Sequence, residues 1–282
     1  MERERRWNAC AEAITRHVEK KRSEELKIMR IRVLGCDGGI GDPLRTCALL
    51  VDNDVLLDAG TGVGELSLSE LIEIEHVFIT HAHFDHIASL PLLLDAVMTS
   101  RSRPITVYAT DENLRSLQTH IFNWSIWPDF SQLLSVENPS MRYSRVELGQ
   151  TVDLGNCRIT PVPANHTIPT VGFHLENGNA SMVYCGDTTT CDPLWEAVNA
   201  IDDLKHLIIE TAFDDAKLQL AERAGHLCPT LLAAELEKLE RPAEIYIDHM
   251  KPGLGETIMR EIGRAVRNRS PRELKRGQVL EL

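Results

Sequence analysis

The sequence lacks the features of a membrane or secreted protein. No run of apolar residues approaches the length of a transmembrane helix, and the first residues contain no apolar signal region. The seven cysteines are scattered and include no Cys-x-x-Cys pair, which is typical of reduced, buried thiols rather than of a disulfide framework. These absences predict a soluble cytoplasmic protein without a membrane partner.

The sequence also lacks a surplus of basic residues. Thirty Lys and Arg residues face 42 Asp and Glu residues, so the formal net charge is −12, which opposes nonspecific binding to nucleic acid backbones. Nor does the chain of 282 residues contain a flexible linker or a short repeat. Its hydrophobic content of 43% is sufficient for a full core. We therefore expect a globular protein whose partner is not a nucleic acid polymer.

Residues 1–28 differ from the rest of the chain because they are dense in Arg, Glu and Lys. Their apolar residues fall at helical spacing and predict a short amphipathic helix: Trp7, Ala11, Ile14 and Val18. This helical extension is either solvated and lightly docked or a dimerisation element, in which case the protein is a homodimer. The compact domain is expected to span residues 29–282.

Six consecutive residues, His81-Ala82-His83-Phe84-Asp85-His86, include four metal-ligand types. They follow the apolar run 76–80, which predicts a buried strand, so the ligands lie on a loop at the carboxyl end of that strand. Imidazoles at alternate positions with a carboxylate between them are typical of a metal site rather than of a surface loop. We expect His81 and His83 to bind one metal, and Asp85 and His86 to bind a second.

The order of the remaining elements indicates the fold class. A strand at 30–34 and a hairpin over 47–58 come first, and strand-helix units follow. From residue 145 onward, hairpins again precede strand-helix units. Strands are predicted at 76–80, 104–110, 146–148, 150–154, 157–163, 170–175, 181–185, 204–209 and 244–247. Helices are predicted at 64–72, 87–99, 111–125, 192–200, 228–239 and 255–267. This order fits an α/β protein built as an αββα sandwich, in which two mixed β-sheets face each other and helices cover both outer faces.

Three further residues occupy the same position at the end of a predicted strand. His166, Asp187 and His249 each follow a short apolar strand, and they bring the number of candidate ligands to seven. Two metals with four or five ligands each need about that many if one carboxylate bridges them and water completes the set. The sequence therefore predicts two divalent metal ions per chain. Zinc is the expected metal, and iron and manganese suit the same ligands.

The order HxHxDH, then His, then Asp, then His resembles the metallo-β-lactamase superfamily of αββα hydrolases, and the resemblance extends from about Met29 onward. It implies two metal sites that share Asp187 as a bridging ligand. The other ligands are His81, His83 and His166 for the first site, and Asp85, His86 and His249 for the second. The β-lactamases often place a cysteine in the second site, whereas only His and Asp are expected in this chain.

Glu210 and His226 resemble a pair found in the phosphodiesterase branch of that superfamily. Glu210 ends the apolar strand 204–209, and His226 stands just before a predicted helix N-terminus, which favours a phosphate anion. By the resemblance, the histidine contacts the phosphate or protonates the leaving oxygen, and the glutamate orients it. The alternative is that His226 is only a capping or surface residue.

Within that branch, the run resembles bacterial 3′,5′-cyclic-nucleotide phosphodiesterases over residues 32–36, 120–124 and 164–167. The implied activity is hydrolysis of cyclic AMP or cyclic GMP to the 5′-nucleotide, with water activated by the two metals as the nucleophile. Phe84 and residues 91–95 depart from the signature of that class. The expected catalytic residues are Asp85, Glu210 and His226. The expected substrate contacts are His226, Asn165 and Gly38, the last in a glycine-rich loop of the kind that forms anion-binding nests.

Other functions compete with this one. A tRNA 3′-processing endonuclease is disfavoured because the chain has no basic, glycine-rich arm and is acidic. A lactone or thioester hydrolase is disfavoured because its reaction has less need of the Glu210–His226 pair. A noncatalytic scaffold on a decayed hydrolase fold is disfavoured because all seven candidate ligands are intact. Trp124 and Trp127 either pack in the protein or form a wall on which a nucleobase stacks.

Overall fold

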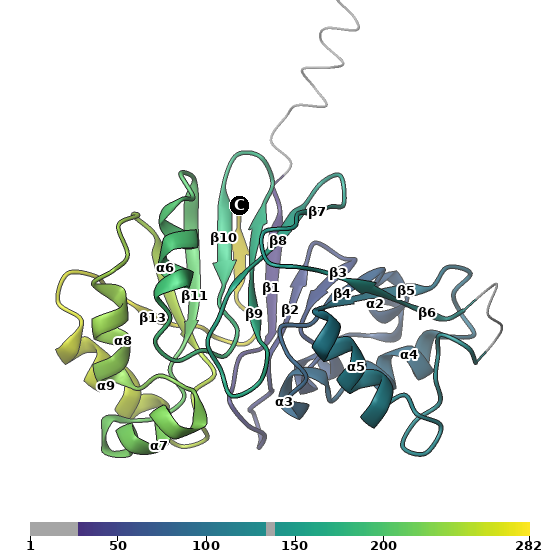
Figure 1. Cartoon of the computed structure of the whole chain (residues 1–282), viewed down its shortest axis with the longest axis horizontal. Coiled ribbons are helices and arrows are strands. Elements are labelled where there is room, and N and C mark those ends of the chain that lie inside the picture. The colour runs from purple at the N-terminus through teal and green to yellow at the C-terminus, as the bar shows by residue number, and fades with distance from the viewer. Residues whose placement is uncertain (1–27, 134–138) are drawn as a thin grey trace, which may run out of the picture.

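The computed structural model describes residues 28–133 and 139–282. The strands form two seven-stranded sheets. The two sheets face each other (Figure 1). In spatial order the first sheet comprises β14 (Val279–Glu281), β1 (Arg30–Gly35), β2 (Ala48–Val51), β3 (Val55–Leu57), β4 (His76–Phe78), β5 (Ile105–Ala109) and β6 (Met141–Arg145). The second comprises β13 (Arg272–Glu273), β12 (Glu244–Asp248), β11 (Leu204–Glu210), β10 (Ser181–Tyr184), β9 (Val171–Glu176), β8 (Arg158–Pro163) and β7 (Val152–Asp153).

Each sheet is mixed, because its hairpin strands pair antiparallel and its strands with helical crossovers pair parallel. In the first sheet, β14, β1, β2 and β3 are antiparallel, and β3 to β6 are parallel. In the second sheet, β7 to β10 are antiparallel, and β10 to β13 are parallel. The carboxyl ends of β4 and β11 therefore carry loops, as parallel strands of this architecture do.

Helices cover the outer faces of both sheets (Figure 1). The first half of the chain supplies the 3₁₀ helix η1 (Thr61–Glu65), α2 (Leu68–Glu73), α3 (Phe84–Ile87), α4 (Leu90–Val97) and α5 (Asp111–His120). The second half supplies α6 (Asp192–Asn199), η2 (Asp215–Lys217), α7 (Leu218–Ala224), α8 (Pro229–Leu236) and α9 (Gly255–Ala265). The prediction of an αββα sandwich is confirmed.

Three hydrophobic layers hold the sandwich together, and alternation along the strands creates them. On β4, Val77 packs beneath the helices of its own sheet, whereas Phe78 packs between the sheets. On β11, Ile208 enters the layer between the sheets, and Leu207 and Ile209 enter the layer beneath the second set of helices. The alternating burial fixes the strand register, and with it the positions of the strand ends.

The prediction of one continuous helix over residues 87–99 is wrong. The structure has two helices there, α3 and α4, with Ser89 between them and Pro91 in the first turn of α4. Proline lacks the N–H that a continuous helix needs and fits only the first turn of a helix. The break places the short α3 directly on the metal-ligand motif.

Other boundaries also differ from prediction. The strand predicted at 146–148 does not form. The edge strand β6 lies just before it and ends at Arg145. The helix predicted at 111–125 ends at His120, and the helix predicted at 64–72 is divided between η1 and α2. The sequence pattern also did not predict α7, β6, β13 or β14.

The helix predicted within residues 1–28 lies, apart from Ile28, outside the described residues. Met29 is buried and exchanges two backbone hydrogen bonds with Leu282, so the pairing of β1 with β14 extends to these two residues. Of the two tryptophans discussed above, Trp127 is partly buried against the hydrophobic layer beneath the helices of the first sheet, and Trp124 is 60% exposed.

Candidate metal centre

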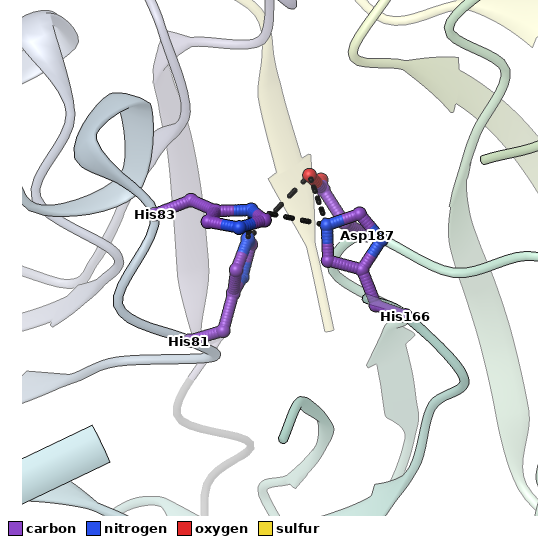
Figure 2. A group of neighbouring side chains, drawn as sticks. All are labelled: His81, His83, His166 and Asp187. Carbon is purple, nitrogen blue, oxygen red and sulfur yellow. Dashed lines mark hydrogen bonds and ion pairs between the residues drawn. The ribbon is translucent and has the colours of Figure 1, made fainter. Parts of the chain in front are cut away.

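Three histidines and one aspartate converge at the strand ends. His81 Nε2 and His166 Nε2 each lie 3.0 Å from His83 Nδ1. Asp187 Oδ2 lies 3.6 Å from His81 Nε2 and 3.8 Å from His166 Nε2. Figure 2 shows His81 and His83 on one side of this group and His166 on the other. The four residues predicted for the first metal are thus brought together, two from the loop after β4, one after β8 and one after β10.

The remaining ring nitrogens of His81 and His166 have partners outside this group. His81 Nδ1 lies 3.0 Å from Thr80 Oγ1, whose hydroxyl is itself a donor to Asp58, and His166 Nδ1 donates to the Gly225 carbonyl at 2.8 Å. These contacts place the protons of His81 and His166 on Nδ1. The Nε2 lone pairs therefore face the centre, which is the arrangement that metal-binding histidines adopt.

A second cluster lies on the other oxygen of Asp187. Asp187 Oδ1 lies 3.2 Å from His86 Nε2 and 3.2 Å from His249 Nδ1. Asp85 is at the rim of this cluster, with Oδ2 3.7 Å from His249 Nε2. Asp187 thus faces the first cluster with one oxygen and the second with the other, as expected of a bridging ligand.

The chemistry of this cluster fits divalent cations. Within the described part of the chain, His86 Nε2 and Asp187 Oδ1 are buried atoms that make no hydrogen bond, although they lie close together. Burial opposes the ionised form of Asp187, but the neighbouring imidazoles hold the pKa of its carboxyl well below the usual range. Burial lowers the pKa of His249 to about 3, so its imidazole is neutral and can donate a lone pair. Histidine and carboxylate donors suit zinc, iron and manganese.

Asp58 is a candidate site residue that the sequence reasoning missed. It is fully buried, and its Oδ2 lies 2.7 Å from His86 Nδ1 and accepts a hydrogen bond from the Tyr184 hydroxyl. The carboxylate therefore orients His86 with its Nε2 toward Asp187. Asp58 directly follows β3, so the strand-end criterion that found His166 would have found Asp58 as well.

Cys47 alters the expectation that only His and Asp surround the second cluster. Its Sγ lies 3.4 Å from His249 Nδ1, and donor atoms of Cys47, His86 and His249 all lie within 4.8 Å of one another. Burial raises the pKa of the Cys47 thiol well above its usual value, which favours a neutral S–H against the imidazole.

Glu210 and His226 form a buried pair beside the metal ligands. His226 Nδ1 donates to Glu210 Oε1 at 2.7 Å, and a ring nitrogen of His226 is within 4.8 Å of donor atoms of Asp187 and His249. Burial opposes protonation of His226, but the Glu210 carboxylate outweighs it and raises the pKa of the imidazole. The structure therefore brings together the pair that the sequence predicted, and His226 lies beside the candidate metal ligands Asp187 and His249.

Backbone donors fix Glu210 in place. Its Oε1 also accepts the Thr188 N–H at 3.0 Å, and its Oε2 accepts the N–H groups of Ala212 and Leu227 at 3.0 and 3.3 Å. A carboxylate with four donors is rigid, so Glu210 can hold one orientation of His226.

The two other expected substrate contacts have different surroundings. The Gly38 N–H donates to the Met250 carbonyl at 3.0 Å, so it is not available to the anion expected in this loop. A Cβ at Gly38 would lie 2.3 Å from the His249 carbonyl oxygen, so the glycine is needed for close packing against that ligand. Asn165 is exposed, and its amide donates to the Thr190 carbonyl at 2.7 Å. The structure brings Asn165 to the rim of the centre beside His166.

An αββα sandwich with histidines and aspartates gathered at its strand ends defines a metal-dependent hydrolase. The sequence model of the family described as "Beta-lactamase superfamily domain" matches residues 53–250, which is more than half of the chain. The protein belongs to this superfamily.

Relatives with two different activities resemble this chain. A Yersinia pestis protein named "Probable 3′,5′-cyclic-nucleotide phosphodiesterase" is 26% identical, over 86% of this chain and 82% of that protein. A Mycobacterium bovis protein named "Ribonuclease Z" is also 26% identical, over 64% of this chain and 71% of that protein. The crystal structure of unliganded yeast PDE1 superposes with a TM-score of 0.76 at 17% identity, over 91% of this chain and all of that chain. In the described part of the chain, no helix has the length and apolar character that a bilayer crossing requires.

Proposed function

We propose that this protein is a metal-dependent phosphodiesterase that hydrolyses 3′,5′-cyclic nucleotides to 5′-nucleotides. The observation that carries the proposal is the His226–Glu210 pair, with 2.7 Å between the two side chains, beside the ligand cluster. Relatives named as cyclic-nucleotide phosphodiesterases support it, since they align over most of this chain.

In the proposed reaction, water attacks phosphorus, the bond to the ribose 3′-oxygen breaks, and that oxygen receives a proton. When bound, divalent ions neutralise the phosphoryl oxygens and acidify the attacking water. His226 donates a proton to the departing 3′-oxygen, which would otherwise leave as a strongly basic alkoxide. Glu210 keeps the other ring nitrogen of His226 protonated and the ring in one orientation.

Asp85 is the ligand best placed for a second role. Its side chain is 30% exposed, whereas Asp187 is buried, so Asp85 borders the approach to the centre. A carboxylate there can accept a hydrogen bond from the attacking water and orient it toward phosphorus.

A panel of substrates tests the proposal. Metal-loaded protein is assayed against cyclic AMP, cyclic GMP, a tRNA precursor and a lactone, with an Asp187→Ala variant as the control for contaminating activity. Hydrolysis of a cyclic nucleotide at the highest kcat/KM is the expected result. Cleavage of the tRNA precursor instead would assign the second candidate, which the relatives named Ribonuclease Z favour.

A further inference from the structure

Lys251 brings a positive charge to the rim of the centre. It stands two residues after His249, in the loop between β12 and α9, and its backbone N–H donates to the Ala212 carbonyl at 3.0 Å. Its Nζ lies 3.3 Å from His249 Nε2, the same nitrogen that is 3.7 Å from Asp85 Oδ2. The backbone is thus anchored while the ammonium borders two predicted metal ligands.

Within the described part of the chain, no salt bridge neutralises the Lys251 ammonium. Among residues 28–133 and 139–282, its Nζ has no carboxylate oxygen within 4.0 Å, although other half-buried lysines such as Lys217 have one. The side chain is only partly exposed, so its charge is incompletely solvated. It is also close enough to act electrostatically on Asp85 and on His226. A lysine in this position is available to an anionic ligand.

The position also selects the kind of ligand. His249 and Asp85 are predicted to hold a divalent cation, and an ammonium beside a dication is repelled unless an anion lies between the two. A phosphoryl group provides such an anion, because it has nonbridging oxygens that a cation on either side can share. A lactone or a neutral ester offers one carbonyl oxygen without a charge, and so gains little from the lysine.

We propose that Lys251 binds a nonbridging phosphoryl oxygen, and that this contact selects phosphate esters over neutral esters at the centre. The inference rests on the proposed phosphodiesterase function and adds a specificity-determining residue to it. The same contact should be stronger with a dianion, such as inorganic phosphate or a phosphomonoester product, than with a monoanionic phosphodiester.

The test compares Lys251→Met, which keeps the aliphatic chain without the charge, with Lys251→Arg, which keeps the charge. Lys275→Met is the matched control, because that lysine is 70% exposed and lies 3.7 Å from Glu273. Binding of inorganic phosphate to metal-loaded protein is measured by calorimetry, after the metal content of every variant has been determined.

Lys251→Met should weaken phosphate binding about 10- to 100-fold, the range expected for one lost hydrogen bond to a charged group. Lys251→Arg and Lys275→Met should bind phosphate nearly as the parent protein does. If Lys251→Met loses metal, Lys251→Gln takes its place. Unchanged phosphate affinity in a variant that keeps both metals, or no phosphate binding by the parent protein, overturns the proposal.

The phosphate measurement does not depend on the identity of the substrate. If phosphate binding requires Lys251 but no cyclic nucleotide is hydrolysed, the proposed function fails and the lysine keeps its role. If cyclic nucleotides are hydrolysed and the phosphate affinity does not change when Lys251 is replaced, the proposed function stands and this inference fails.

Discussion

Replacing His226 by alanine should slow the hydrolysis of substrates with a strongly basic leaving group much more than that of substrates with a weakly basic one. The change removes the imidazole but leaves Glu210 with three backbone donors, so the surroundings of the site should keep their structure. A general acid contributes about 10²–10⁴-fold to a step that expels an alkoxide. We expect kcat/KM for cyclic AMP to fall by that factor, which corresponds to about 2.7–5.4 kcal/mol of transition-state stabilisation.

A substrate that needs no acid supplies the internal control. Bis(p-nitrophenyl) phosphate expels a weakly basic phenolate, so His226→Ala should largely spare its hydrolysis. Glu210→Gln should give a milder form of the same division, because Glu210 orients the acid rather than supplying the proton. Both substrates are assayed on the same protein samples, with the metal content measured in each.

The pH profile tests the same role. His226 acts as an acid only when protonated, so activity on cyclic AMP should be lost as pH rises through its pKa. Although burial opposes protonation, Glu210 raises that pKa, so Glu210→Gln should lower it and move the alkaline limb of the profile to lower pH. Activity on bis(p-nitrophenyl) phosphate should lack this limb.

Two outcomes would refute the reasoning. Equal loss of activity on both substrates at full metal content would make His226 a phosphate ligand and not an acid. Loss of metal in His226→Ala would instead make it a metal ligand, which its approach to Asp187 and His249 allows.

Three further predictions concern the metals and the domain boundary. Asp187→Ala should abolish activity and lower the metal content measured by mass spectrometry without unfolding the protein, and full occupancy with near-normal turnover would remove Asp187 from the site. Asp58→Asn, which tolerates the positive φ of 58° at this position, should weaken binding of the second metal about 10- to 100-fold in a metal titration, because His86 loses the carboxylate that orients it. A chain starting at Met29 should fold and keep its metals, since every proposed ligand lies beyond it; an insoluble or inactive product would place residues 1–28 in the core or in a required contact.

The sequence was sufficient to predict those site residues whose position depends on the local pattern of apolar strands. His166, Asp187 and His249 each follow an apolar strand, and their strands β8, β10 and β12 run in the same direction in the second sheet, so the three carboxyl ends lie at the same edge. The same reasoning placed Glu210 at the end of β11. Such residues are predictable because the strand both precedes them in sequence and positions them in space.

Residues that act through tertiary contacts were not predictable in this way. Cys47 immediately precedes β2 of the first sheet, and its thiol meets His249, which follows β12 of the second sheet, only because the two sheets face each other. Lys251 belongs to no motif that the sequence analysis used, and its importance comes from the position of its ammonium beside His249 Nε2. The edge strands β6 and β14 were missed for a related reason, since short edge strands carry weak patterns and are defined by their partner.

The pairing of β1 with β14 has a consequence for how the chain acquires its structure during synthesis. β1 is the first described strand to emerge from the ribosome and β14 is the last, yet Arg30 pairs with Glu281. Until β14 has emerged, β1 has β2 on one side and an open edge on the other, and an apolar strand with an open edge can pair with other chains. Contacts so distant in sequence also slow folding. We therefore expect the first sheet to close only after β14 has left the ribosome, and the nascent chain to expose the open edge of β1 until then.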